Sequence, residues 1–235
     1  MKATIIAHTV VTPGFFEAVR AEGLRTLASL PDAHLLTEFA GRECYQSWTN
    51  PAGRTNHGYI GHLIDQGHES VFEHATVTFR LTSVSRSLLT ELTRHRHLSF
   101  SVQSQRYVDE SEAFVIVPPD LRDIEDREVL VILNDAARGA LDSYETIVDR
   151  LTVEHGWTRK KARSAARAVL PNMTETRIVV TGNHRSWREV IRKRAAPGAD
   201  REIRDLAGML LRELRAIAPA LYQDMTDNDN GGGNA

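Results

Sequence analysis

The chain has 235 residues, of which 41% are hydrophobic and 26% charged, the composition of an ordinary globular protein. Its formal net charge of −2 at pH 7 argues against wholesale nucleic-acid binding. The longest apolar runs fall short of the roughly 20 residues that span a bilayer. The single cysteine, Cys44, excludes an internal disulfide and fits a reducing cytoplasm. We expect one domain over residues 1–235, with Cys44 as a half-buried structural thiol and a disordered tail over about 226–235.

Hydrophobic periodicity predicts a mixture of helices and strands in the first part of the chain. The predicted elements are a strand over 1–8, a helix from Phe15 toward Pro31, a helix over 35–44, a helix capped by Asn56 and ended by Gly67, and a strand over 75–81. The last of these is the clearest, because its apolar and polar side chains alternate as in a half-buried strand.

The same signals continue to the end of the chain. They predict a helix capped by Ser85 and running to about Arg94, a strand over 113–118, a helix over 129–151, a helix over 159–170 capped by Thr158, a strand over 176–181, a helix from Asn183 to about Arg194, and a helix from Asp200 to Pro219. We therefore expect an α+β fold, with an antiparallel sheet built from the four strand-like runs and helices packed on it. The apolar stripe of the long helix serves either the core or an interface between subunits.

Residues 94–107 are the part of the sequence that is densest in hydrogen-bond donors. Three arginines, two histidines, three serines and two glutamines fall within these fourteen positions. Because the arginine guanidinium matches phosphate and carboxylate oxygens, this composition predicts a pocket for an anionic ligand such as a phosphorylated small molecule. The alternative is the solvated basic end of a helix, where cations are favoured by the macrodipole.

Two other groups of side chains have both a structural and a functional interpretation. Glu91 and Arg94 are three residues apart, so a helix would place them on one face, either as a surface ion pair or as partners of a pyrimidine edge. His68, Glu73 and His74 lie where a helix passes into a strand, and there they serve structural hydrogen bonds or bind a metal.

Residues 94–106 resemble the signature of the flavin-dependent thymidylate synthases, RHRxxSxNxxSxR. The match covers Arg94, His95, Arg96, Ser99, Ser104 and Arg106. The sequence departs from the family at Ser101, where the pattern has Asn, and at Val102, where members often carry Glu or Gln.

Three further segments resemble the same family. Residues 67–74 are similar to its GHxSxxEH run, and 166–171 are similar to its AR-x-VLP segment. Residues 183–186 are similar to its Asn-x-Arg-Ser element, and Arg194 corresponds to a family arginine that reaches the uracil. The resemblance extends over about residues 40–220 and leaves the first 35 without a motif.

The resemblance implies reductive methylation of dUMP to dTMP, with 5,10-methylenetetrahydrofolate as carbon donor and FAD, reduced by NADPH, as hydride source. It implies a homotetramer with FAD at the subunit interfaces, and neither a metal nor an enzyme nucleophile. The implied catalytic residues are Arg94 and Arg194. The implied dUMP contacts are Glu91, Arg94, Gln103, Ser104, Gln105, Arg106, Arg167 and Arg194. The implied FAD contacts are His68, Ser70, Arg94, His95, Arg96, His97, Asn183, Arg185 and Glu189.

Two functions of other classes compete with this interpretation. In the first, a nucleic-acid-binding module, the arginine clusters would follow a phosphate backbone, but the balanced charge and 6% aromatic content count against it. In the second, a metal-dependent phosphohydrolase, the metal ligands would be His68, Glu73, His74 and His95.

Overall fold

A computed structural model describes residues 1–22, 30–48, 55–124 and 126–226 of the chain. It forms two compact units. Unit 1 contains residues 1–2, 81–94 and 100–179, and unit 2 contains residues 3–80, 95–99 and 180–235. Most of the predicted tail and part of the stretch between Phe15 and Pro31 lie outside the described residues. The single domain expected from the sequence remains a prediction.

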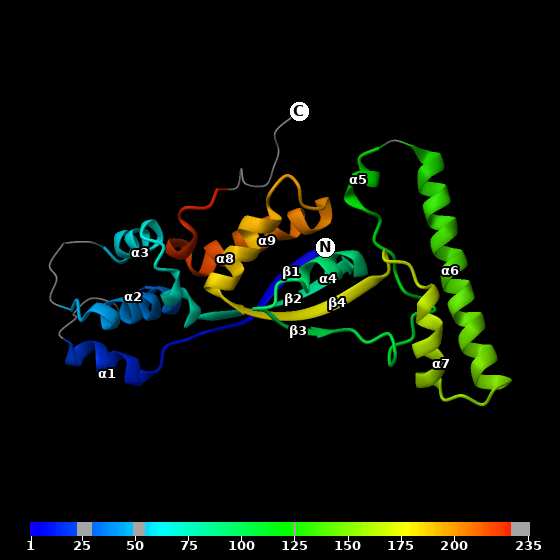
Figure 1. The fold of residues 1–235 in the computed structure, drawn as a ribbon, viewed down its shortest axis with the longest axis horizontal. Coiled ribbons are helices and arrows are strands. Elements are labelled where there is room, and N and C mark those ends of the chain that lie inside the picture. The colour runs from blue at the N-terminus through cyan, green and yellow to red at the C-terminus, as the bar shows by residue number, and fades with distance from the viewer. Residues whose placement is uncertain (23–29, 49–54, 125, 227–235) are drawn as a thin grey trace. The chain divides into compact units, whose positions relative to one another are not determined.

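The strands form one antiparallel four-stranded sheet in the order β1-β2-β4-β3 (Figure 1). They are β1 (Lys2–His8), β2 (Thr76–Ser85), β3 (Ser99–Val102) and β4 (Glu175–Asn183). The predicted α+β class is therefore confirmed, as are three of the four predicted strands.

The strand predicted over 113–118 is wrong. In this stretch only Val115 forms an isolated bridge, to Thr174. The prolines at 118 and 119 lack the N–H groups that a longer ladder would need, so the pairing stops. The fourth strand is β3 instead, in which Phe100 and Val102 are half-buried while Ser99 and Ser101 are exposed. Four residues within the polar segment 94–107 therefore form a strand, with side chains that alternate between exposed and half-buried.

Unit 2 contains five helices among its described residues. They are α1 (Pro13–Ala21), α2 (Asp32–Tyr45), α3 (Asn56–Asp65), α8 (His184–Arg194) and α9 (Arg201–Ile217), with short 3-10 segments at Glu69–Glu73 and Pro219–Tyr222. The helices α8 and α9 pack side by side (Figure 1). Trp187 of α8 lies edge-on to Phe79 of β2, with ring centroids 5.1 Å apart, and its Nε1 donates to the Val77 carbonyl at 3.2 Å. This contact fixes α8 on the sheet, and α8 carries several of the predicted site residues.

Unit 1 contains the other four helices of the described chain. They are α4 (Arg86–Leu92), α5 (Pro119–Arg122), α6 (Arg127–Val153) and α7 (Arg159–Ala166), followed by a 3-10 segment at Arg167–Val169. The long helix α6 packs against α7 (Figure 1). Their core contains Tyr144 and Val148 of α6 and Ala162 and Ala166 of α7. The alanines let the two helices approach closely around the Tyr144 ring.

The structure tests the predicted helix ends one by one. Ser85, Thr158 and Asn183 act as N-caps, as predicted. The cap of α3 is Thr55 rather than Asn56, because Thr55 Oγ1 accepts from Gly58 N at 3.2 Å while Asn56 Nδ2 donates to Glu38 Oε2 at 2.8 Å. Asp200 precedes α9 but makes no side-chain capping bond.

Two further expectations are corrected. Cys44 is exposed near the end of α2, so the half-buried thiol is wrong. The helix α4 ends at Leu92 instead of about Arg94. Arg94 therefore lies in the following turn, and the argument that it shares a helix face with Glu91 does not hold.

Candidate functional site

A cavity of about 380 Å³ in unit 2 brings together several predicted site residues. It is lined by Glu73, His97, Asn183, Arg185, Ser186 and Glu189. Four of these six, His97, Asn183, Arg185 and Glu189, are predicted FAD contacts. We call this cavity the β4–α8 pocket, because most of its lining comes from the junction of those two elements.

The junction owes its geometry to local chemistry. Asn183 Oδ1 accepts from Ser186 N at 2.8 Å, which caps α8 and turns the chain out of β4. Arg185 and Glu189 are four residues apart and thus share a helix face. A Cβ at Gly182 would lie 2.4 Å from Leu98 Cδ2, so a larger residue at 182 would require the Leu98 side chain to move. His97, the neighbour of Leu98, lines the pocket.

The pocket contains both donors and acceptors. Arg185 Nη1 donates to Glu73 Oε1, and Lys193 donates to Glu189 Oε1 one turn further along α8. The hydrogen bond from Lys193 lowers the pKa of the Glu189 carboxyl, so that group is ionised at neutral pH. Asn183 uses its amide oxygen for the cap and keeps two N–H donors. The lining can therefore bind a ligand that presents phosphate oxygens together with N–H or O–H groups.

Arg194, predicted to act on the uracil, is the last residue of α8. Its Nε donates to His95 Nε2 at 2.9 Å. Arginine remains protonated in proteins, so His95 Nε2 must be the acceptor and a neutral ring carries its proton on Nδ1. The structure thus joins a predicted substrate contact to a predicted flavin contact within unit 2.

His68 and Ser70, also predicted flavin contacts, lie outside the lining of the β4–α8 pocket. The His68 ring stacks on Tyr45, with centroids 5.9 Å apart. Glu69, which lies between His68 and Ser70 in the sequence, accepts hydrogen bonds from Arg188 and Arg192, at 3.1 and 2.7 Å. Although burial alone would raise the pKa of Glu69, these bonds lower it. The segment that carries His68 and Ser70 is therefore anchored to α8 by charge.

Four predicted nucleotide contacts, Gln103 to Arg106, follow β3 in unit 1. They belong to an irregular segment, residues 103–108, which we call the signature loop. Gln103 N donates to the Arg177 carbonyl at 2.9 Å, which continues the ladder with β4. Tyr107 N and Val108 N both donate to the Ser104 carbonyl, at 3.2 and 3.0 Å. Ser104, Gln105 and Arg106 thus form a tight turn, and Arg106 is exposed.

Arg86 is a cation at this loop that the sequence analysis missed. Its Nη2 donates to the Gln103 carbonyl at 2.7 Å. Burial lowers the pKa of Arg86; the charge of Glu110 opposes this shift, and a smaller repulsion from Arg167 adds to it. Its Nε has no hydrogen-bond partner within the described chain. One signal was present: Arg86 is the first residue of α4, where the macrodipole disfavours a cation.

Three further predicted residues lie outside both the lining of the β4–α8 pocket and the signature loop. Arg96 is exposed in the turn before β3 and does not line the β4–α8 pocket. Arg167 was predicted inside a helix over 159–170 but begins the 3-10 segment that follows α7. Glu91, in α4, is half-buried.

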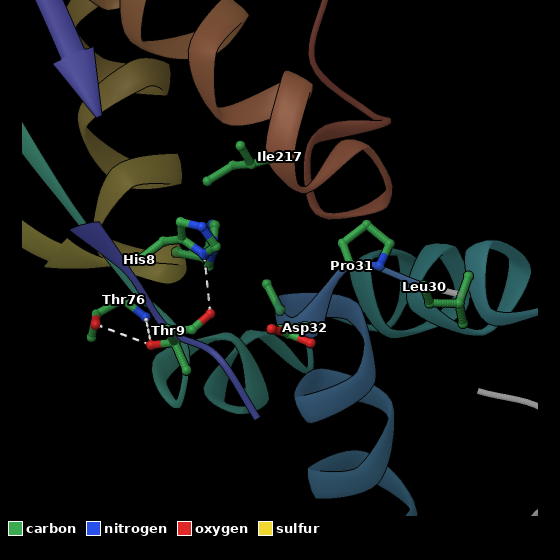
Figure 2. A pocket seen from close by; sticks show the side chains of 9 residues that line it. His8, Thr9, Leu30, Pro31, Asp32, Thr76 and Ile217 are labelled. Carbon is green, nitrogen blue, oxygen red and sulfur yellow. Dashed lines mark hydrogen bonds between the residues drawn. The ribbon is translucent and has the colours of Figure 1, made fainter. Parts of the chain in front are cut away.

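A second cavity, of about 320 Å³, contains none of the predicted residues. Figure 2 shows His8 and Thr9 of its lining beside Asp32 and Thr76. Thr9 Oγ1 accepts from Thr76 N at 2.9 Å, and His8 Nδ1 bonds the Thr9 carbonyl at 3.1 Å. His184 also lines it and bonds Tyr222 Oη through Nδ1 at 2.8 Å.

Among the described residues, no three His, Cys, Asp or Glu side chains lie close enough together to hold a metal ion. None of the helices in the described ranges combines the length and apolar character that a membrane crossing requires.

Comparison with known proteins identifies the family. A family model described as thymidylate synthase complementing protein matches residues 25–220. A probable flavin-dependent thymidylate synthase of Mycobacterium phage L5 is 51% identical over 240 residues, which are 97% of this chain and 98% of that protein. The flavin-dependent thymidylate synthase of Mycobacterium tuberculosis is 52% identical over 197 residues, 80% of this chain and 78% of that protein.

A solved structure has the same fold. Thymidylate synthase X from Helicobacter pylori, crystallised with FAD and dUMP, matches with a TM-score of 0.64 at 21% identity. The match spans 98% of this chain and 99% of that one. The chain belongs to the thymidylate synthase complementing protein family, which includes the flavin-dependent thymidylate synthases.

Proposed function

We propose that the protein is a flavin-dependent thymidylate synthase that converts dUMP to dTMP. The carbon donor is 5,10-methylenetetrahydrofolate, and NADPH is the reductant. When bound, FAD supplies the hydride chemistry, and the chain binds and orients the reactants. The family match and relatives at about half identity over most of the chain support this assignment.

The observation that carries the proposal is the β4–α8 pocket. It combines Arg185, the capped start of α8 and the amide of Asn183, all of which can donate to phosphate oxygens of a dinucleotide. Glu73 and Glu189 add acceptors for N–H or O–H groups. These donor and acceptor types fit FAD, and Asn183, Arg185 and Glu189 are among the FAD contacts that the family resemblance implies.

The nucleotide assignment rests on the signature loop. Ser104, Gln105 and Arg106 present hydroxyl, amide and guanidinium donors on one turn, and Arg86 and Arg167 add positive charge in the same unit. A phosphate monoester needs this kind of surrounding. Gln103, Glu91 and Arg94 complete the proposed dUMP contacts.

We assign the activation of the uracil to arginine. Arg194 and Arg94 draw electron density from the pyrimidine carbonyls, which makes the ring a better acceptor. Ser104 does not resemble an activated nucleophile, because its Oγ accepts from Arg106 N at 3.4 Å and the described residues contribute no base bonded to it. Exposed Cys44 has no role in this scheme.

The remaining assignments follow from the family. His68, Ser70, His95, Arg96 and Arg94 are proposed to complete the flavin site. We propose a cytoplasmic homotetramer with FAD at its subunit interfaces. Val131, Ile132 and Val153 of α6 are 53 to 81% exposed, and an interface would bury their apolar surface.

The test is the visible absorbance spectrum of the purified protein, followed by anaerobic NADPH. We expect a flavin spectrum, present on purification or after FAD is supplied, that NADPH bleaches and dUMP perturbs. A protein that takes up no FAD would contradict the proposal. Salt-dependent nucleic-acid binding would then be the next assay.

A further inference from the structure

Arg163 of α7 holds the far end of the signature loop. Its Nη1 donates to the Tyr107 carbonyl at 2.9 Å, and its Nη2 donates to Asp109 Oδ2 at 2.5 Å. A single guanidinium therefore fixes one backbone group and one side chain two residues apart. The planar fork of arginine allows this double contact, whereas the point charge of lysine cannot reproduce both bonds with the same geometry.

The near end of the loop is fixed independently. Arg86 binds the Gln103 carbonyl, and Gln103 N is bonded to Arg177 of β4. Between these anchors lie Ser104, Gln105 and Arg106, the residues proposed to contact the nucleotide. All of these groups belong to unit 1. The turn thus has one anchor before it and one after it, and Arg163 supplies the second.

The charge state of this anchor is suited to neutral pH. Burial alone would raise the pKa of Asp109, but hydrogen bonds from Ser111 and Arg163 outweigh it and lower the pKa. Ser111 N donates to Asp109 Oδ1 at 3.2 Å, so the carboxylate uses one oxygen for its own turn and the other for Arg163. The Asp109 carboxyl therefore stays ionised at neutral pH.

The environment of Arg163 is more constrained than that of an ordinary surface ion pair. Its side chain is 15% exposed, compared with 67% for Arg150, which pairs with Glu154 on α6. The Nε atom of Arg163 is buried without a hydrogen-bond partner in the described part of the chain, which costs free energy of folding. Arg163 thus binds the loop through Nη1 and Nη2 while its Nε hydrogen bond is left unmade.

We propose that Arg163 is a positioning residue, which binds the Tyr107 carbonyl and the Asp109 carboxylate and so keeps Ser104, Gln105 and Arg106 in the conformation that binds the nucleotide phosphate. The inference rests on the proposed function. It differs from the role assigned to Arg167, because Arg163 acts through the loop and does not touch the substrate.

The test is calorimetric titration of FAD-loaded protein with dUMP, together with steady-state kinetics. R163Q is expected to raise the Kd and the KM for dUMP about tenfold, while FAD content, melting temperature and kcat at saturating dUMP stay near wild type. R163K should restore part of the affinity. R163Q/D109N should bind no more weakly than R163Q alone, because both changes break one anchor.

R150Q is the matched control, since it breaks the exposed ion pair between Arg150 and Glu154, which lies in the same unit and does not contact the loop. Its Kd for dUMP should equal that of wild type. If R163Q does not fold, D109N decides the question, because its amide oxygen keeps the acceptor for Ser111 N while its NH2 group replaces the oxygen that accepts from Arg163. Wild-type affinity in the folded R163Q or D109N variant would overturn the positioning role alone. A wild-type protein that binds FAD but no dUMP would overturn both this role and the proposed function.

Discussion

The two proposed ligand-binding regions differ in how the chain holds them. The β4–α8 pocket is built mainly from a strand end, an N-cap and one helix face, all within residues 182–189. The signature loop has no regular structure and depends on Arg86 and Arg163, which lie 17 and 56 residues away from their loop partners. We infer that the flavin side tolerates the loss of distant contacts better than the nucleotide side does.

The largest effect should come from Arg194, the last residue of α8, whose Nε donates to His95. R194A removes the guanidinium that we propose to polarise the uracil, and we expect kcat for dTMP formation to fall about 10³-fold. FAD content should change little, because α8 and its cap remain. R212A is the control, since Arg212 is an exposed arginine of α9 in the same unit. Equal losses in R194A and R212A would contradict the assignment.

His184, the buried first residue of α8, should make the stability of the fold depend on pH. Burial lowers the pKa of His184 from 6.5 to about 3, with smaller contributions from His34, His8 and Arg188. The unfolded chain therefore binds a proton below about pH 6.5 that the folded chain does not, and stability falls as the pH drops through that window. At pH 5 this amounts to about 2 kcal/mol.

The measurement is urea unfolding at pH 7 and pH 5. H184Q should lose less free energy of unfolding between these two values than wild type does. H155Q, which removes an exposed histidine, should keep the wild-type difference. An H184Q protein that is as acid-sensitive as wild type would show that the burial of His184 does not set this slope.

Asn183 separates capping from ligand binding. N183A should lower the free energy of unfolding by about 1 kcal/mol, because Ser186 N loses its acceptor. N183D keeps an equivalent cap but replaces two N–H donors with negative charge. We expect N183D to have wild-type stability and weaker FAD binding, as measured by flavin retained on gel filtration. Full retention in N183D would remove Asn183 from the proposed flavin site.

The same difference explains what the sequence could predict. Caps at Ser85, Thr158 and Asn183 follow from side-chain chemistry within one turn, and the alternation in β2 is visible in its letters. The strand β3 was not predicted, because its serines were interpreted as part of the binding signature and not as the exposed positions of an alternating strand. The role of Arg163 depends on partners 54 and 56 residues away, and the sequence alone cannot distinguish Arg163 from an arginine on a solvated basic helix face.

The most direct test of the central claim is dTMP formation, measured by chromatography, from dUMP, 5,10-methylenetetrahydrofolate, NADPH and FAD-loaded protein. We predict repeated turnover when all components are present and none when dUMP, folate or flavin is omitted. FAD-loaded protein that NADPH reduces but that makes no dTMP from dUMP and the folate would contradict the account.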